Sequence, residues 1–170
     1  MLEYFNTPQA YFCQVISPQP LHLAIEHIFL QVWQKIPILF PSPSGQLLNQ
    51  IVVEKLSKDL SEFIRICGHY EGIDERIIEM YDVQKISIGE YVISSWELSS
   101  MVLIDSLIRH IPGVLWNTQS LAEDSFSEKL DRKKEYPVYT RPAEFEWYKV
   151  PDVLLSGIHA EIEKWKFQNL

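Results

Sequence analysis

The stretch CGHYEGIDERIIEMYDVQKISIGEYVISSWELSSMVLIDSLIRHIPG, residues 67–113, decides the fold of this chain. In it, glycines and polar residues interrupt apolar runs where short strands are expected to end. The pattern predicts a strand over 84–88 and a helix over 97–111, which a Pro-Gly pair stops. The polar connection GEYVISSW, residues 89–96, therefore follows directly on a strand end.

The same alternation of strand and helix patterns extends to both sides of this stretch. Further helices are predicted over 20–33, 47–56, 73–81 and 159–167. Further strands are predicted over 36–40, 62–67 and 150–157, with PSPSG (41–45) breaking the chain after the first of them. Strands that alternate with helices are typical of an α/β fold with a parallel sheet flanked by helices.

Length and composition favour one domain over residues 1–170 with a substantial core, since 46% of the residues are hydrophobic. Residues 116–137 are polar and weakly periodic, which predicts a mobile loop. No apolar run of about 18 residues exists, so we expect no membrane span. The N-terminus lacks the pattern of a signal peptide, and a reducing, cytoplasmic location is expected.

The charge and the spacing of possible metal ligands argue against nucleic-acid binding over the whole surface and against a metal site. The net charge of -8 argues against a grip on nucleic acid over the whole surface, although Arg132, Lys133 and Lys134 form a local basic patch. Cys13 and Cys67 have no CxxC spacing, and the histidines are scattered. We therefore expect neither a disulfide nor a metal site.

Three predicted strands are each followed by an unusual loop: PSPSG, GHYEG and GEYVISSW. In open α/β sheets, ligands collect beyond the carboxyl ends of the strands. One such loop is most often only a turn, but three at consecutive strand ends indicate a ligand site. Periodicity does not identify the ligand.

The motifs GHYEGIDER, SIGEY, MVLID, IPGVL, EDSF, YTRP and VPDVLLSG occur in this order along the chain. In this respect the chain resembles the bacterial tRNA (guanine-N1)-methyltransferase family TrmD, of the SPOUT class. The resemblance implies a deep trefoil knot, a homodimer and S-adenosylmethionine as methyl donor. It also implies a tRNA substrate, methylated on the guanosine next to the anticodon. The family's C-terminal tRNA-binding domain is expected to be absent.

The resemblance assigns roles to residues of this chain. Asp124 matches the general base that removes the N1 proton of guanine, and Arg109 matches an arginine that positions or polarises the base. The residues that match the three cofactor loops of the family are Ser42, Pro43, Gly45, Gly68, Tyr70, Glu71, Gly72, Ser87, Ile88, Gly89, Tyr91 and Ile93.

Several positions depart from the family pattern. Ser95, Trp96 and Ser99 stand where two glycines and a proline are usual. The indole of Trp96 either stacks on the adenine or fills its place, and we favour filling. Three more departures replace glycine or asparagine with apolar side chains, which indicates hydrophobic packing in place of a pocket: Trp116, Trp147 and Ile158.

Two main functions follow from these residues, and a third, which keeps cofactor or nucleotide binding but changes the acceptor, ranks last. The first hypothesis is a TrmD-like protein with lost or impaired methyltransferase activity, which acts as a dimeric binding or scaffold protein. The alternative is an active S-adenosylmethionine-dependent tRNA (guanine-N1)-methyltransferase. We rank the non-catalytic hypothesis first because several glycines that allow close approach to a cofactor are missing.

Overall fold

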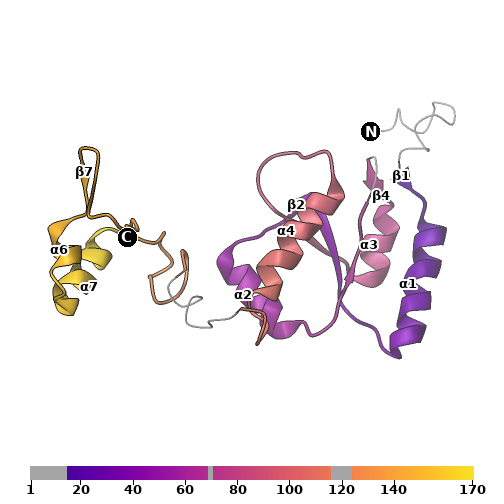
Figure 1. The fold of residues 1–170 in the computed structure, drawn as a ribbon. Helices are drawn as coiled ribbons and strands as arrows, with labels where there is room; N and C mark the ends of the chain where they lie inside the picture. Colours follow the sequence, from indigo (N-terminus) through magenta and orange to yellow (C-terminus); the bar gives the residue numbers. More distant parts are fainter. Residues whose placement is uncertain (1–14, 69–70, 116–123) are drawn as a thin grey trace. The chain divides into compact units, whose positions relative to one another are not determined.

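The computed structural model describes residues 15–68, 71–115 and 124–170 (Figure 1). The chain divides into two compact units, Met1–Val114 and Leu115–Leu170, and each is described by itself. The single domain and the trefoil knot both stay predictions.

The first unit is built on parallel strands. β2 (Ile38–Leu47) lies between β3 (Ile64–Arg65) and β5 (Gln84–Ser87), and both neighbours run parallel to it. A second parallel pair joins β1 (Val15–Ile16) to β4 (Gly72–Ile73). The predicted parallel α/β fold is therefore confirmed.

Helices cover both faces of the three-stranded sheet (Figure 1). One face packs against α1 (Pro18–Val32) and α3 (Glu75–Tyr81), and the other against α2 (Gln50–Asp59) and α4 (Trp96–Ile108). Among the described residues, no helix is long and apolar enough to cross a membrane.

The alternation of side chains along β2 divides the core into two clusters. Ile38 and Phe40 point to one face and Leu39 to the other. The first cluster contains Ile25, Ile38, Phe40, Ile64, Ile66, Ile77 and Val83. The second contains Leu39, Val53, Leu56, Ile86, Leu103 and Leu107. Since β2 is covered on both faces, its first residues form a continuous apolar run, as in buried parallel strands.

Side-chain caps fix where α2 and α3 begin. Asn49 Oδ1 accepts a hydrogen bond from the Val52 N–H at 3.0 Å at the start of α2. At the start of α3, Asp74 accepts from the Arg76 N–H at 3.0 Å and from its guanidinium at 2.8 Å. The side-chain hydrogen bond from Arg76 is the main reason that the pKa of Asp74 falls to about 2.

The second unit contains a hairpin and two helices. The hairpin pairs β6 (Glu144–Phe145) with β7 (Tyr148–Lys149), and α6 (Asp152–Leu155) and α7 (His159–Gln168) follow. The predicted closing helix is confirmed. The predicted strand over 150–157 is wrong.

A helix start explains why the strand prediction failed. Pro151 precedes α6 and Asp152 lies in its first turn, and both residue types favour a helix N-terminus. The prediction of a mobile loop concerns residues 116–137, of which 116–123 lie outside the described residues. Residues 124–137 contain turns but no helix or strand.

Candidate functional site

The first wall of a ligand-sized cavity is a bulge in β2. The strand pairs with β5 at Pro41 and again at Gln46, and both residues have Ile86 as partner. Residues 42–45 therefore loop out of the ladder between these two pairings. The prediction that PSPSG ends the strand is wrong, because β2 resumes and runs on to Leu47.

Gly45 brings the bulged chain back onto β5. A Cβ atom at this position would lie 2.4 Å from the Ile86 nitrogen and 2.4 Å from the carbonyl carbon of Lys85. Both are backbone atoms of a central strand pair and have little freedom to move. Only glycine fits here, because the two backbones approach each other so closely.

The second wall is the connection between β5 and α4, which arches beside β2 in Figure 1. Ser87 Oγ accepts a hydrogen bond from the Gly89 N–H at 3.3 Å and donates to the Gly89 carbonyl at 3.0 Å. The Tyr91 hydroxyl donates to the Ile88 carbonyl at 3.4 Å. Residues 90–94 are exposed, so short-range hydrogen bonds rather than core packing shape this wall.

These two walls enclose a cavity of about 520 Å³. Its volume falls in the range of roughly 300–1,000 Å³ that is usual for small-molecule sites. It is lined by Pro41, Ser42, Pro43, Ile86, Ser87, Ile88, Gly89, Tyr91, Val92, Ile93, Ser94, Ser95, Trp96, Glu97 and Ser99.

Most residues predicted for the first and third cofactor loops meet at this cavity. Those that line it are Ser42, Pro43, Ser87, Ile88, Gly89, Tyr91, Ile93 and Trp96. The structure therefore brings two of the three predicted loops together. Their binding of a cofactor stays a prediction.

The remaining predicted cofactor residues do not line the cavity. Gly45 allows β2 to approach the backbone of β5 after the bulge, and Glu71 is exposed. Gly68 is buried against Phe40, and Gly72 has a φ of +127° and pairs with β1. The local structure therefore explains why glycine is present at both positions. Tyr70 lies outside the described residues.

Sequence reasoning missed five lining residues: Pro41, Ile86, Val92, Ser94 and Glu97. Each of them is next in sequence to a predicted site residue. Extending the predicted motifs by one residue would therefore have included them. Among the described residues, no cluster of three or more histidine, cysteine or acidic side chains is placed to hold a metal ion.

The serines that depart from the family pattern have local roles at the start of α4. Ser95 is the N-cap, and its Oγ accepts from the Leu98 N–H at 3.4 Å and donates to Glu97 Oε2 at 2.7 Å. Ser99 Oγ donates to the Trp96 carbonyl at 2.8 Å. Serine is among the preferred N-cap residues, so these changes are compatible with a well-formed helix.

Trp96 packs beside the cavity. Its ring stacks on Phe40, with centroids 5.0 Å apart and planes at 15°. The indole thereby joins the edge of the core cluster on that side of the sheet, and the cavity of about 520 Å³ remains next to it.

Two of the other aromatic and apolar departures are described in the second unit, and both are exposed within it. Trp147 is 90% exposed at the turn of the β6–β7 hairpin. Ile158 is about half exposed and precedes α7 without a side-chain capping bond. Neither residue packs into a core of its own unit, their predicted packing in place of a pocket stays a prediction, and Trp116 lies outside the described residues.

The two predicted catalytic residues belong to different units. Arg109 ends α4 in the first unit and is exposed. Asp124 is half-buried in the second unit and starts a turn in which its carbonyl accepts from the Ser127 N–H at 3.1 Å. The turn is closed by a bond from the Phe126 N–H to the Lys133 carbonyl at 2.7 Å. The structure therefore describes each residue in its own unit only.

The parallel sheet and the ligand-sized cavity at its strand ends place the chain in the class of α/β proteins with a candidate small-molecule site. Residues 11–170 match the model of the family described as tRNA (Guanine-1)-methyltransferase TrmD. The chain belongs to this family, which confirms the resemblance found in the sequence motifs.

Bacterial relatives agree with the family assignment. A "tRNA (guanine-N(1)-)-methyltransferase" of Oceanobacillus iheyensis is 48% identical over 152 residues, which is 89% of this chain and 60% of the relative. Proteins of the same name are 47% identical in Brevibacillus brevis, over 91% of this chain and 61% of the relative, and 45% identical in Bacillus cereus strain AH820, over 89% and 61%. The chain thus spans about three fifths of the length of these relatives.

Proposed function

We propose that this chain is the cofactor-binding part of an S-adenosylmethionine-dependent tRNA (guanine-N1)-methyltransferase. The cavity between the β2 bulge and the β5–α4 connection is the proposed methyl-donor site. The acceptor is N1 of the guanosine next to the anticodon. The observation that carries the proposal is the cavity of about 520 Å³ beside Trp96.

The chemistry of the cavity wall fits the proposed donor. The donor would supply a methyl group on a positively charged sulfur, next to an adenosine and an amino acid. The wall offers apolar and aromatic side chains at Ile88, Tyr91 and Trp96, together with the carboxylate of Glu97. A mostly apolar site with a few polar groups is the usual composition of a small-molecule pocket.

Asp124 is the proposed general base and Arg109 the proposed positioning residue. Guanine N1 becomes nucleophilic once its proton has passed to the Asp124 carboxylate, and a nearby guanidinium favours the resulting charge on the base. In the proposed homodimer, one copy of the chain supplies Asp124 and the other copy supplies Arg109 to the same active site. The family assignment supports these roles.

The non-catalytic function that we ranked first from the sequence is the weaker hypothesis. It assumed that Trp96 occupies the ligand space and that Trp147 adds hydrophobic packing. The indole of Trp96 packs on Phe40, however, and Trp147 is 90% exposed. Relatives 45–48% identical to this chain are named as methyltransferases, which favours the alternative.

Methyl transfer to unmodified tRNA tests the proposal. We expect Asp124→Asn to reduce transfer by about 10²–10⁴-fold, the usual contribution of a general base. Glu128→Gln is the matched control, since it removes an exposed acid from the same loop. Transfer that Asp124→Asn leaves unchanged, or a wild-type chain that binds the donor without methylating tRNA, contradicts the proposed reaction.

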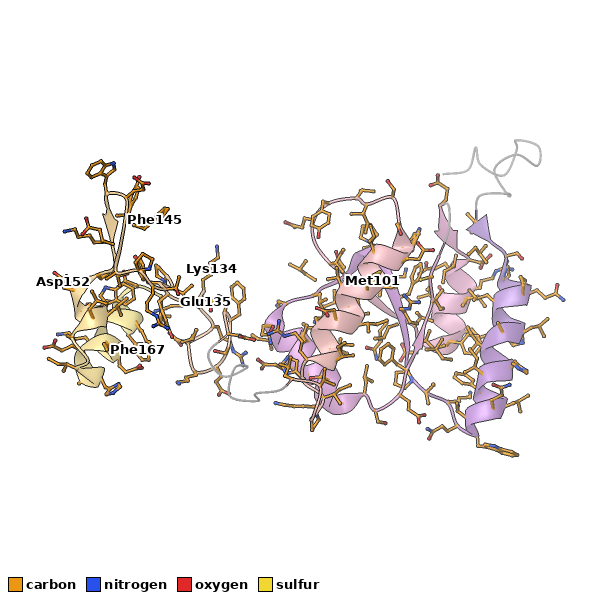
Figure 2. The ribbon with its side chains drawn as sticks, in the orientation of Figure 1. Met101, Lys134, Glu135, Phe145, Asp152 and Phe167 are labelled. Carbon is orange, nitrogen blue, oxygen red and sulfur yellow. The ribbon has the colours of Figure 1, made fainter. Side chains whose placement is uncertain are left out.

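The outer face of α4, formed by Leu98, Met101 and Val102, supports the proposed homodimer. These side chains are 55%, 62% and 48% exposed, although the opposite face of the helix is buried against the sheet (Figure 2 labels Met101). A helix that is apolar on both faces is usually buried on both. A second copy of the chain is the proposed cover, because most symmetric oligomers use one patch of each copy.

Light scattering at micromolar concentration tests the homodimer. We expect a dimer that Met101→Glu shifts toward monomer. Met80→Glu on α3 is the control, since Met80 is also 62% exposed but lies outside the outer face of α4. A wild-type monomer, or equal behaviour of the two variants, contradicts the α4 interface.

A further inference from the structure

Trp96 is held in one orientation by contacts on the core side of its ring. It stacks on Phe40, and a Cβ on Gly68 would lie 3.4 Å from the indole and 3.2 Å from the Phe40 ring. The hydroxyls of Ser99 and Ser100 both donate to the Trp96 carbonyl at 2.8 Å. Backbone and ring are therefore fixed before a ligand arrives.

The residue held by these contacts also borders the cavity. Trp96 lines the cavity, whereas Phe40 and Gly68 do not. Trp96 therefore belongs both to the edge of the core cluster and to the cavity wall. A planar aromatic ligand on the cavity side finds a rigid aromatic surface of matching shape, and stacking of this kind needs no further ordering of the side chain.

We propose that Trp96 is the stacking surface that holds the adenine ring of S-adenosylmethionine in this cavity. The inference rests on the proposed function, and adenine is the only planar aromatic group of that donor. Glu97, bound to Ser95 at 2.7 Å, supplies a carboxylate to the same wall, where the edge of a heterocycle can donate hydrogen bonds. The indole thereby fixes the orientation of the ligand.

Calorimetry with S-adenosylhomocysteine, which carries the same adenosine without the reactive methyl group, measures the stacking. Trp96→Leu keeps an apolar contact with Phe40 but removes the aromatic face. We expect it to weaken binding roughly 5- to 100-fold, as for loss of one base–aromatic stack. Trp96→Phe restores an aromatic ring, so we expect it to bind within about threefold of wild type.

Tryptophan fluorescence gives a second readout. If Trp96 only supported the fold, adding the ligand would leave its emission unchanged. Adenine stacked on an indole is expected to alter the emission of that residue. We expect quenching on addition of S-adenosylhomocysteine in wild type and in Trp33→Phe, because Trp33 is 93% exposed at the end of α1. In Trp96→Phe the quenching is lost although binding persists.

The outcomes separate this inference from the proposed function. Wild type that binds, with Trp96→Leu binding equally well and no quenching, overturns the stacking role and leaves the donor site intact. Tighter binding by Trp96→Leu means that the indole occupies ligand space, which also overturns it. If neither wild type nor any variant binds, the proposed donor site itself is wrong. The fluorescence of Trp96→Phe decides the case if Trp96→Leu fails to fold.

Discussion

The two walls of the cavity are held by different forces. The β2 bulge is fixed by backbone contact with β5, where Gly45 leaves no room for a Cβ atom. The β5–α4 connection is exposed over residues 90–94 and is shaped by side-chain hydrogen bonds at its ends. The difference teaches that a side chain added at Gly45 has to displace backbone atoms, whereas one added at Gly89 in the second wall would first meet the ring of Tyr91.

Gly45→Ala is the change expected to have the largest effect on this comparison. The new Cβ would meet backbone atoms at 2.4 Å, so β2 and β5 have to separate. We expect a loss of about 3 kcal/mol or more in the free energy of unfolding, measured by urea denaturation. Ser44→Ala, at the next residue, is the control and should cost less than about 0.5 kcal/mol. Equal effects of the two changes would falsify the idea of a backbone-fixed wall.

A hydrogen-bonded contact outside both walls shows how much a half-buried side-chain hydrogen bond contributes to the stability of this unit. The Tyr81 hydroxyl on α3 donates to Glu26 Oε1 on α1 at 2.8 Å and also bonds His22 Nδ1. We expect Tyr81→Phe to cost about 1–2 kcal/mol in the free energy of unfolding, because it leaves the half-buried Glu26 and His22 without this hydrogen-bond partner. Tyr91→Phe, with a weaker bond at 3.4 Å in an exposed loop, should cost less than about 0.5 kcal/mol.

The same tyrosine gives the contact a pH signature. Burial and then the bond to Glu26 raise the pKa of Tyr81 from 10.0 to about 12. The folded state thus favours the neutral phenol, so its contribution to stability is complete below pH 10 and is lost as the pH rises through 12. Urea titrations at pH 8 and 11 should show a smaller alkaline loss in Tyr81→Phe than in wild type. An unchanged loss would mean that other groups cause it.

The cap of α4 is the next test, because it joins the second wall to the helix. Ser95→Ala should cost about 1 kcal/mol in the free energy of unfolding, similar to Asn49→Ala at the cap of α2. Ser95→Gly should cost only a few tenths, since glycine is also accepted at N-caps. Thermal unfolding of the three variants measures this. If Ser95→Gly is as damaging as Ser95→Ala, the cap does not explain why serine replaces glycine there.

The smallest effect is expected in the middle of the second wall. Val92 is 87% exposed, so Val92→Ser should change the free energy of unfolding by less than about 0.5 kcal/mol. Thermal unfolding of wild type and Val92→Ser side by side is sufficient. A loss above about 1 kcal/mol would indicate that this wall packs more firmly than its exposure implies, and the contrast with Gly45 would weaken.

Local sequence patterns predicted the three-stranded sheet and the helices of the first unit, but not the short pair of β1 and β4. Apolar periodicity placed the strands around Ile38, Ile64 and Ile86 and the helices between them, because their burial repeats along the chain. The bulge was missed because Pro41 and Pro43 normally end a strand, and its return depends on a contact with β5 that is distant in sequence.

The second unit shows the limits of short patterns. The hairpin turn at Glu146 and Trp147 has none of the glycine or asparagine that usually mark such turns, and Glu146 takes a φ of 54°. For the site, the loop positions were predictable but the direction of the Trp96 ring was not. That direction depends on Phe40, whose distance from Trp96 in the sequence hides the contact.

Pro43 in the bulge and Pro41 just before it also determine how this cavity can be observed. Proline carries no amide hydrogen, so Pro41 and Pro43 give no signal in hydrogen-exchange or amide NMR measurements. Amide reporters remain in both walls: the Gly89 N–H donates to Ser87 Oγ at 3.3 Å, and the Leu48 N–H, just after β2, donates to the Ser87 carbonyl at 2.7 Å. We expect a ligand in the cavity to slow hydrogen exchange at Gly89 and Leu48, whose amides both bond to Ser87.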